Sequence, residues 1–367
     1  MTLIAAVGLD TYPAVFGDLL ISGPEQSGAV PSIPLVGEAT SVFPAGSEGS
    51  ILGLNQKVVL LDDNCVIAWA GNIEFARTVI GALRAIASNA PLSLAIIESY
   101  LAQLDPTVRD EVSFIGWVKD GEVFHQFWYR AAVAKSAMFG QVSAGGSGAI
   151  DFVTLAAEIS GGTWNAPGRA LTGLERAISS MLSATSLLLQ AELSSQSNLL
   201  HYFGGGYEIA TFIGGKFAKV GDIAFVFWMA HVTDGQVALS GPWFVLKQDY
   251  AGESLLLHLL LMRPGEVNTD PPIVEEHQHV ISPFGGTVDA AHATGISWPG
   301  FEATFTCHVV LVHLPTSIAV FNRIDYSESR APMSIRFSLE ASRVSFEVNP
   351  QFSDELTQSI RAGFVDS

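Results

Sequence analysis

Two apolar runs near the start of the chain decide the fold that we expect. Residues 2–22 read TLIAAVGLDTYPAVFGDLLIS, in which residues 3–9 and 14–22 are mostly apolar and a Thr-Tyr-Pro segment lies between them. Short apolar runs on either side of a turn segment are typical of buried strands joined as a hairpin. We therefore predict a buried hairpin over residues 3–22, with Thr2 directly before its first strand.

The segments that follow alternate between runs of strands and pairs of helices. Short apolar runs indicate strands, and apolar residues at helical spacing indicate helices. In chain order we predict strands at 57–61 and 65–70, helices at 73–88 and 92–104, strands at 112–118 and 123–129, helices at 150–159 and 171–193, and strands at 207–213, 223–231 and 243–247. Paired helices between runs of strands favour an α+β sandwich with helices outside two sheets.

The pattern changes after about residue 261. Residues 264–272 are polar and rich in proline; strand-like segments follow at 304–314, 317–323 and 334–348, and a helix at 354–364 has Ser353 as its expected N-cap. We therefore divide the chain into a main domain, residues 1–264, and a β-rich C-terminal extension, residues 265–367, of unknown role. Residues 22–50, rich in glycine, proline and serine and without a clear period, are predicted to form a loop.

The composition excludes several classes of partner. The chain has 367 residues, of which 49% are apolar and 15% charged, and its formal net charge is −18. This charge repels nucleic-acid phosphates and anionic membrane surfaces, and no apolar run is long enough to span a bilayer. The two cysteines form no disulfide framework, and residues 1–7 lack the basic segment of a secretory signal. We therefore expect a cytoplasmic protein that binds neither nucleic acid nor membranes.

Thr2 is the candidate nucleophile. A small side chain at position 2 favours removal of Met1 by methionine aminopeptidase, which would leave Thr2 with a free α-amine next to its hydroxyl. Such an amine titrates at about pH 8 and can act as the general base for the hydroxyl of the same residue.

Three further positions have the spacing of an active site. Asp18 follows Thr2 by sixteen residues, near the middle of the second predicted strand; Lys57 begins the third, and Gly71 lies fourteen residues further on. A lysine ammonium close to Thr2 would stabilise its alkoxide and favour the neutral amine, while Asp18 would keep the lysine charged and oriented. The N–H of a glycine can approach an oxyanion closely because no side chain intervenes.

In this order, and with Gly146-Ser147-Gly148 before a predicted helix, the chain resembles the proteasome β-subunit family of N-terminal-nucleophile hydrolases over residues 2–247. The resemblance implies a four-layer αββα sandwich, and it implies that residues 22–50 are an insertion in the main domain. It assigns Thr2 as the nucleophile, Asp18 as the partner of Lys57, the Gly71 amide as the oxyanion hole and Ser147 as a neighbour of the Thr2 amine. It also implies a homo-oligomeric peptidase that needs no metal or organic cofactor.

One segment departs from the family. Where the family has an aspartate followed three residues later by Ser-Gly-Gly, residues 201–206 read HYFGGG, so that His201 replaces the aspartate and Gly204 the serine. A histidine can transfer protons, which makes His201 a candidate catalytic residue. Alternatively, His201 is a hydrogen-bonded loop residue, Asp18 and Lys57 form a structural ion pair, and the protein is an inactive scaffold or assembly protein. A small-amide amidase of the same class is a third interpretation.

The resemblance also places three side chains beside Thr2, namely Val59, Trp69 and Ile73. Side chains of this kind would form an apolar substrate pocket, narrowed by the indole of Trp69. We therefore predict that the residue accepted next to the cleaved bond is a small or medium apolar one.

A separate polar segment has the residue types of a metal site. Residues 275–279 read EEHQH, so His277 and His279 would lie on one side of a strand as a usable pair of ligands. A third ligand would have to come from His292, His308 or His313 through folding, because none follows from the local spacing. We expect a polar strand or loop there and no metal.

Overall fold

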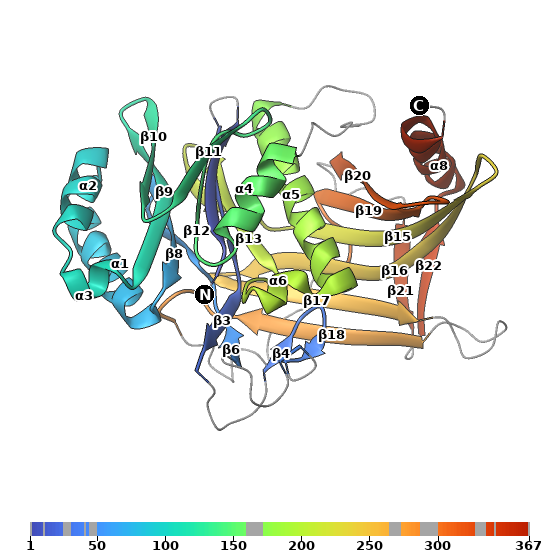
Figure 1. Ribbon diagram of the computed structural model, residues 1–367, viewed down its shortest axis with the longest axis horizontal. Helices are drawn as coiled ribbons and strands as arrows, with labels where there is room; N and C mark the ends of the chain where they lie inside the picture. Colours follow the sequence, from blue (N-terminus) through green and yellow to red (C-terminus); the bar gives the residue numbers. More distant parts are fainter. Residues whose placement is uncertain are drawn as a thin grey trace.

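The computed structural model describes residues 2–9, 12–24, 31–39, 42–43, 50–158, 172–263, 273–286, 300–326, 335–340 and 343–365. These residues form a mixed α+β fold in which most neighbouring strands are antiparallel (Figure 1). Within this part of the chain, no helix combines the length and the apolar character needed to cross a membrane.

The N-terminal hairpin lies at the centre of the first sheet. Ile4 pairs with Gly17 in antiparallel register, which confirms the predicted hairpin. Its second strand ends at Asp18, so the prediction of a strand as far as residue 22, with Asp18 near its middle, was wrong. The sheet has the order β11-β12-β1-β2-β13-β14, made of β1 (Ile4–Leu9), β2 (Tyr12–Asp18), β11 (Ala132–Ser136), β12 (Gly140–Gly145), β13 (Tyr207–Ile213) and β14 (Lys216–Lys219).

The chain leaves this sheet at Leu19 and forms a small flap from the predicted insertion. Here β3 (Leu20–Gly23) pairs with β6 (Ser50–Leu54), and β4 (Ser32–Ile33) pairs with β5 (Gly37–Glu38). The flap buries its own apolar cluster, to which Leu20, Ile33 and Ile51 belong. Part of the predicted insertion is therefore ordered secondary structure rather than loop.

The second sheet confirms the predicted strands and the first predicted helix. Its order is β10-β9-β8-β7, made of β7 (Val58–Asp62), β8 (Cys65–Gly71), β9 (Val112–Asp120) and β10 (Val123–Tyr129). Three helices lie in the chain between β8 and β9, namely α1 (Ile73–Ala87), α2 (Leu94–Ala102) and α3 (Pro106–Arg109). Asn72 caps α1, because its side chain accepts hydrogen bonds from the N–H groups of Glu74 and Phe75.

The two sheets face each other, and helices cover their outer faces. Ile4 of the first sheet and Val66 and Ile115 of the second belong to one buried cluster between them. On the far side of the second sheet, α1 and α2 bury Val79, Leu83 and their neighbours (Figure 1). On the far side of the first sheet lie α4 (Ala149–Glu158) and α5 (Gly173–Ser195), followed by the short α6 (Ser197–Leu200).

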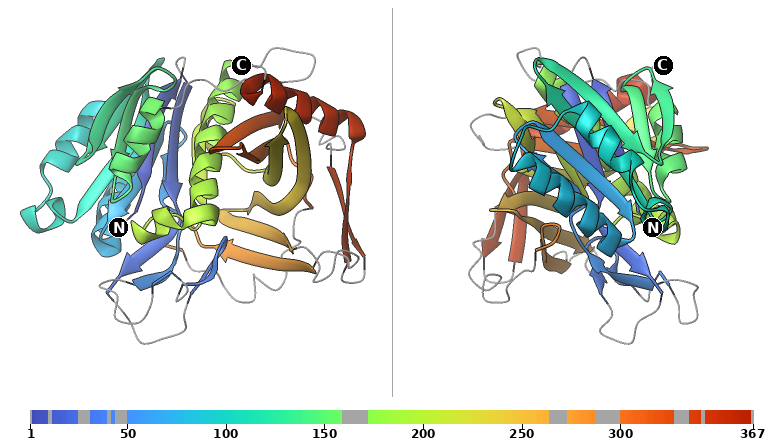
Figure 2. Two further views of the ribbon diagram at one scale, coloured as in Figure 1. Left: turned by 45° about the vertical axis from the view of Figure 1, so that its right-hand side comes forward. Right: turned by 90° about the vertical axis from the view of Figure 1, so that its left-hand side faces the viewer.

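A third sheet packs on the other side of α5, so that this helix lies between two sheets (Figure 2). Its order is β18-β17-β16-β15-β19-β20, made of β15 (Ile223–Thr233), β16 (Gln236–Ala251), β17 (Ser254–Arg263), β18 (Ile273–Ile281), β19 (Phe305–His313) and β20 (Ile318–Tyr326). β15 pairs with β19 in parallel, and β17 pairs with β18. The predicted division at residue 264 therefore separates paired strands of one sheet.

The chain closes with a hairpin and a helix. β21 (Ile335–Glu340) and β22 (Arg343–Val348) form the hairpin, and α8 (Pro350–Phe364) follows directly. The helix begins four residues earlier than predicted, with Asn349 rather than Ser353 as N-cap, because the Asn349 side chain accepts the Gln351 N–H and proline is well suited to the first helical position. Its face of Phe352, Leu356 and Ile360 packs on the third sheet.

Candidate active site

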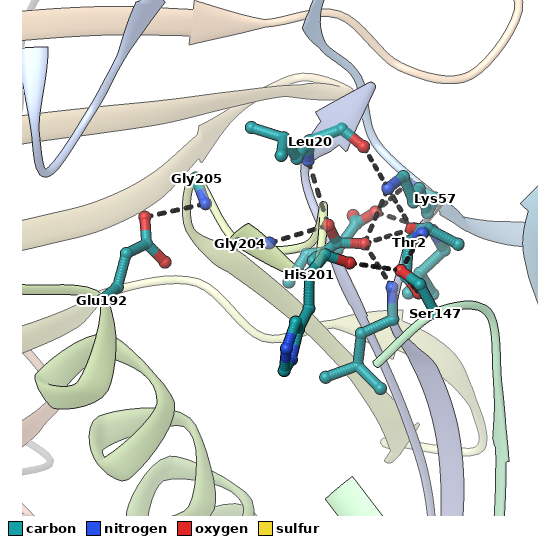
Figure 3. Close-up of polar contacts among 12 residues, drawn as sticks. Thr2, Leu20, Lys57, Ser147, Glu192, His201, Gly204 and Gly205 are labelled. Atoms are coloured by element: carbon teal, nitrogen blue, oxygen red, sulfur yellow. Dashed lines mark hydrogen bonds and ion pairs between the residues drawn. The ribbon is translucent and has the colours of Figure 1, made fainter. Parts of the chain in front are cut away.

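The hydroxyl of Thr2 lies between a buried cation and a buried anion. Thr2 lies two residues before the start of β1 and is only 1% exposed. Its Oγ1 accepts a hydrogen bond from Lys57 Nζ and donates one to Asp18 Oδ1 (Figure 3). The structure therefore brings together the three residues that the sequence predicted as nucleophile, positive group and negative group.

Asp18 is held by backbone donors as well as by the lysine. Its Oδ1 accepts the Leu3 N–H at 2.9 Å and lies 2.6 Å from Lys57 Nζ. Its Oδ2 accepts the Gly204 N–H at 2.9 Å and the Leu20 N–H at 3.3 Å. This number of donors suits a charged carboxylate, because hydrogen bonds to the ionised form offset the loss of water on burial.

Lys57 is positioned through its backbone and through its side chain. Burial lowers the pKa of the ammonium, while the neighbouring Asp18 opposes this shift. Nζ also donates to the Leu20 carbonyl, in addition to its contacts with Thr2 and Asp18. The buried carboxylate of Glu208 accepts the Lys57 N–H and, at 2.6 Å, the Val58 N–H, so the chain is fixed where it enters β7.

The Gly-Ser-Gly segment holds the backbone of Thr2. The Thr2 N–H donates to Ser147 Oγ at 3.2 Å, and the Gly148 N–H donates to the Thr2 carbonyl at 3.1 Å. Gly146 has φ +86°, and a Cβ there would lie 2.1 Å from the Thr2 carbonyl oxygen. Only glycine fits this approach. Ser147 is thus where the prediction placed it, next to the Thr2 nitrogen.

A cavity of about 340 Å³ opens beside Thr2 and Lys57. Trp69 forms part of its wall and packs on Phe284, with ring centroids 4.7 Å apart. The remaining wall is mostly apolar, with one acidic side chain, and is made of Ile21, Ser22, Gly23, Pro24, Leu52, Gly71, Asn72, Ile73 and Glu74. Of the predicted substrate-binding residues, Trp69 and Ile73 therefore lie at this cavity.

Gly71 lies at the same cavity in a backbone conformation that favours glycine. Its φ is +98°, and a Cβ would meet the Glu111 carbonyl oxygen at 2.0 Å. The next residue, Asn72, donates its N–H to that carbonyl at 2.9 Å, so the chain turns sharply from β8 into α1. Gly71 and Thr2 therefore line the same cavity, as an oxyanion donor for Thr2 would have to.

Two predicted site residues lie elsewhere. Val59 is buried in the core that α1 covers, and it lines a separate cavity of about 420 Å³. The imidazole of His201 points away from Thr2 (Figure 3). It is bound to Asp151 Oδ2 at 3.0 Å, and 60% of the side chain is exposed. The part of His201 that reaches the site is its carbonyl oxygen, which accepts a hydrogen bond from Ser147 Oγ at 2.7 Å. The prediction of proton transfer by its side chain finds no support in this geometry.

Several contributors were missed by the sequence analysis. They are backbone groups of Leu20 and Gly204 and the buried carboxyls of Glu192 and Glu208. The glycine run at 204–206 was a usable signal, because consecutive glycines mark a backbone that packs closely. The two glutamates carried no local signal, since acidic residues on a helix or strand are usually exposed.

The polar segment at 275–279 lies on β18, as a strand with His277 and His279 two residues apart. Burial and the neighbouring His277 lower the pKa of His279 to about 4. His308 accepts a hydrogen bond from Trp228 within the third sheet, and His313 stacks on His231. His292 lies outside the described residues. Among the residues that are described, no three metal-binding side chains are grouped as a metal site.

Comparison of the chain with protein-family models and with curated proteins found no match to either.

Proposed function

We propose that this protein is an N-terminal threonine amide hydrolase, a peptidase similar to proteasome β-subunits. One observation carries the proposal: the buried Thr2 hydroxyl is hydrogen-bonded to both Lys57 and Asp18 at the wall of a cavity. A hydroxyl in contact with an ammonium is easier to ionise, and a cavity beside it gives a substrate carbonyl room to approach.

The reaction would begin with the removal of Met1. The Thr2 hydroxyl then gives its proton to its own α-amine, and Oγ1 forms a bond to the substrate carbonyl carbon. The Gly71 N–H stabilises the oxyanion. The C–N bond breaks, the leaving amine takes the proton from the Thr2 ammonium, and an ester remains on Oγ1. Water hydrolyses the ester and releases the acid, which regenerates Thr2.

The remaining residues would orient these groups. Ser147 Oγ accepts a hydrogen bond from the Thr2 N–H and donates one to the His201 carbonyl oxygen. A lone pair of Ser147 Oγ therefore faces the Thr2 nitrogen. Burial lowers the pKa of Lys57; Asp18 opposes this shift and so favours the charged ammonium. Charged Lys57 next to the hydroxyl favours both the alkoxide and the neutral α-amine.

The arrangement of elements agrees with this proposal. The proposed four-layer αββα sandwich is supported by two facing sheets with α1 and α2 on one side and α4 and α5 on the other, with the third sheet added outside α5. We also propose that the protein is a cytoplasmic homo-oligomer and that it works without a metal or organic cofactor. The substrate would be a peptide with a small or medium apolar residue before the cleaved bond, since Ile21, Leu52, Trp69 and Ile73 line the cavity.

Two measurements test the proposal. The intact mass of the protein should show that Met1 is absent, because the mechanism needs a free Thr2 amine. A peptide epoxyketone, which reacts with both the hydroxyl and the amine, should then form one covalent adduct that Thr2→Ala abolishes and Thr2→Ser retains. Retention of Met1, or a processed protein that forms no adduct, would contradict the proposal.

An inactive scaffold or assembly protein is the second candidate. It is favoured by the loop at 201–206, where the side chains expected of the family are absent and the His201 imidazole pairs with Asp151 at the surface. Failure of the processed protein to react would support it. Reaction with small amides but not with peptides would instead favour an amidase of the same class.

A further inference from the structure

Near the end of α5, a buried carboxyl contacts the glycine loop that supports the site. Glu192 is 0% exposed, and its Oε1 accepts the Gly205 N–H at 2.9 Å (Figure 3). Its Oε2 is buried and has no hydrogen-bond partner within the described part of the chain. An ionised carboxylate in this position would lack most of the donors that it needs, whereas a neutral carboxylic acid needs fewer.

The loop that Glu192 contacts carries the groups that hold the catalytic residues. The Gly204 N–H donates to Asp18 Oδ2 at 2.9 Å, and the Gly204 carbonyl accepts the N–H groups of Leu19 and Leu20, each at 3.1 Å. The carbonyl of Leu20 in turn accepts from Lys57 Nζ. A shift of this loop would therefore move both the carboxylate and the ammonium that contact Thr2.

Glu192 also fills the space in front of Gly204. Gly204 has φ +130°, and a Cβ at this position would lie 2.5 Å from Glu192 Oε2. The family that the chain resembles has a serine at this position, whose side chain would need the volume that the Glu192 carboxyl occupies. Glu192 and Gly204 are therefore complementary, and the carboxyl takes the place of a side chain in the loop.

We propose that Glu192, as a neutral carboxylic acid, is a positioning residue for the Thr2 site, and that its ionisation at alkaline pH disturbs the site by displacing the glycine loop. This inference rests on the proposed function for its catalytic consequence, but its structural part does not. Because Glu192 touches neither Thr2 nor the cavity, it would act through Gly205 and Gly204.

The charges around Glu192 support a neutral form. Burial raises the pKa of Glu192 to about 8; the hydrogen bond from the Gly205 N–H opposes this shift, and Asp18 adds a smaller contribution to it. Tyr207 of β13 has its own pKa raised, first by burial and then by Glu192 and Asp18. Of the other described elements packed on α5, α6 supplies the uncharged Asn198, bonded to the Tyr207 hydroxyl, and β19 supplies Cys307 beside Ser186, more than one helical turn from Glu192. β20 contacts α5 through Asn322 at Ser183, further along the helix, and its charged Arg323 and Asp325 pair with each other.

The first experiment measures the epoxyketone labelling rate of Thr2 against pH in the wild type and in Glu192→Leu, Glu192→Gln and Leu189→Ala. Glu192→Leu, which keeps the bulk but removes the acceptor, should react about tenfold more slowly at pH 7, as expected for loss of one hydrogen bond. Glu192→Gln keeps an acceptor and cannot ionise, so it should retain most of the rate. The wild-type rate should fall relative to that of Glu192→Gln above about pH 8.

Leu189→Ala on the same helix is the control, because it removes a buried side chain that is not among the groups nearest to Gly204, Gly205 or Gly206. It should lower stability without changing the pH profile. If Glu192→Leu and Leu189→Ala show the same labelling rate and the same pH profile as the wild type, Glu192 has only a packing role and the proposal is wrong.

A second experiment does not depend on catalysis. Amide hydrogen exchange of Gly204 and Gly205 should be faster in Glu192→Leu than in wild type by about tenfold, and close to wild type in Glu192→Gln. If the protein never labels but these amides respond as expected, the proposed function fails and the positioning role stands. Unchanged exchange in Glu192→Leu would overturn the role whatever the activity.

Discussion

At Lys57, burial and charge oppose each other. The ammonium is almost completely buried and lies 2.6 Å from Asp18, so burial lowers its pKa while the carboxylate opposes the shift. A buried ion pair contributes little net stability, because the loss of water offsets the attraction between the two charges. The pair is therefore better explained by what it does to the Thr2 hydroxyl than by what it adds to the fold.

Replacement of Lys57 by methionine tests this explanation. The variant keeps the length of the side chain but leaves Asp18 buried without its cation, so the free energy of unfolding should fall by about 3–5 kcal/mol. The labelling rate of Thr2 should fall at least about 100-fold, because the alkoxide loses its positive neighbour. Chemical denaturation and epoxyketone labelling measure the two effects.

The double variant Asp18→Asn, Lys57→Met separates stability from chemistry. It removes both charges and keeps one oxygen that can accept the Leu3 N–H. The amide NH₂ cannot accept the Gly204 and Leu20 N–H groups that Asp18 Oδ2 accepts, so only part of the lost stability should return. The labelling rate should stay low. Recovery of the rate in the double variant would show that the charged pair is not needed for the reaction.

The role of Gly71 as an oxyanion donor can be tested with Gly71→Ala, which adds a single methyl group. Gly71→Ala would place a Cβ 2.0 Å from the Glu111 carbonyl in a backbone conformation with φ +98°. The end of β8 would have to move, and the labelling rate should fall by about 10²–10³ as the oxyanion donor is displaced. Gly215→Ala is a matched control, since Gly215 has φ +93° with nothing within 4 Å. It should lose only about 1–3 kcal/mol of stability and label normally.

At the scale of elements, the β3–β6 flap forms one wall of the cavity beside Thr2. Leu52 of β6 lines the cavity and is 38% exposed. Leu52→Ala should enlarge the cavity at small cost to stability, and kcat/KM should shift about tenfold toward substrates with larger apolar residues. Leu200→Ala is the control, because Leu200 is 54% exposed and is absent from the cavity wall. An unchanged preference in Leu52→Ala would place the specificity pocket elsewhere.

Helix α5 should make stability depend on pH through Glu192. The pKa of this group is about 8 in the folded protein and about 4.5 when exposed, so the folded state holds a proton that the unfolded state releases between these values. The wild type should therefore lose stability relative to Glu192→Gln as pH rises from about 4.5 to about 8, with no further loss above. Denaturant titrations of both proteins at several pH values measure the difference. Parallel curves would show that Glu192 ionises normally.

At the scale of the whole molecule, the third sheet makes the C-terminal segment part of the structural core. β15 and β17 each pair with a strand that follows residue 264. A chain that ends at residue 263 would expose two long apolar strand edges and one face of α5, and we expect it to aggregate or to unfold without cooperativity. Circular dichroism and sedimentation measure this. A soluble fragment with the melting temperature of the full chain would show that the two parts are independent.

Much of the local structure followed from the sequence because it depends on neighbouring residues. The hairpin at β1 and β2, the strands of the second sheet and α1 all have the apolar period expected of their type. β12 was missed because its sequence, GQVSAG, is short and rich in small residues, although it pairs with β1 in the buried first sheet. Pairing with a buried strand, rather than its own propensity, makes it a strand.

The sequence by itself determined which groups were available: a threonine at position 2, an aspartate and a lysine at suitable spacing, and glycines where the chain turns. Only the tertiary structure decided that Thr2, Asp18 and Lys57 meet, that Val59 and the His201 imidazole lie elsewhere, and that Glu192 contacts the site from α5. The physical reason is that local periodicity reports which face of an element is buried, whereas contacts between distant segments depend on how those faces pack.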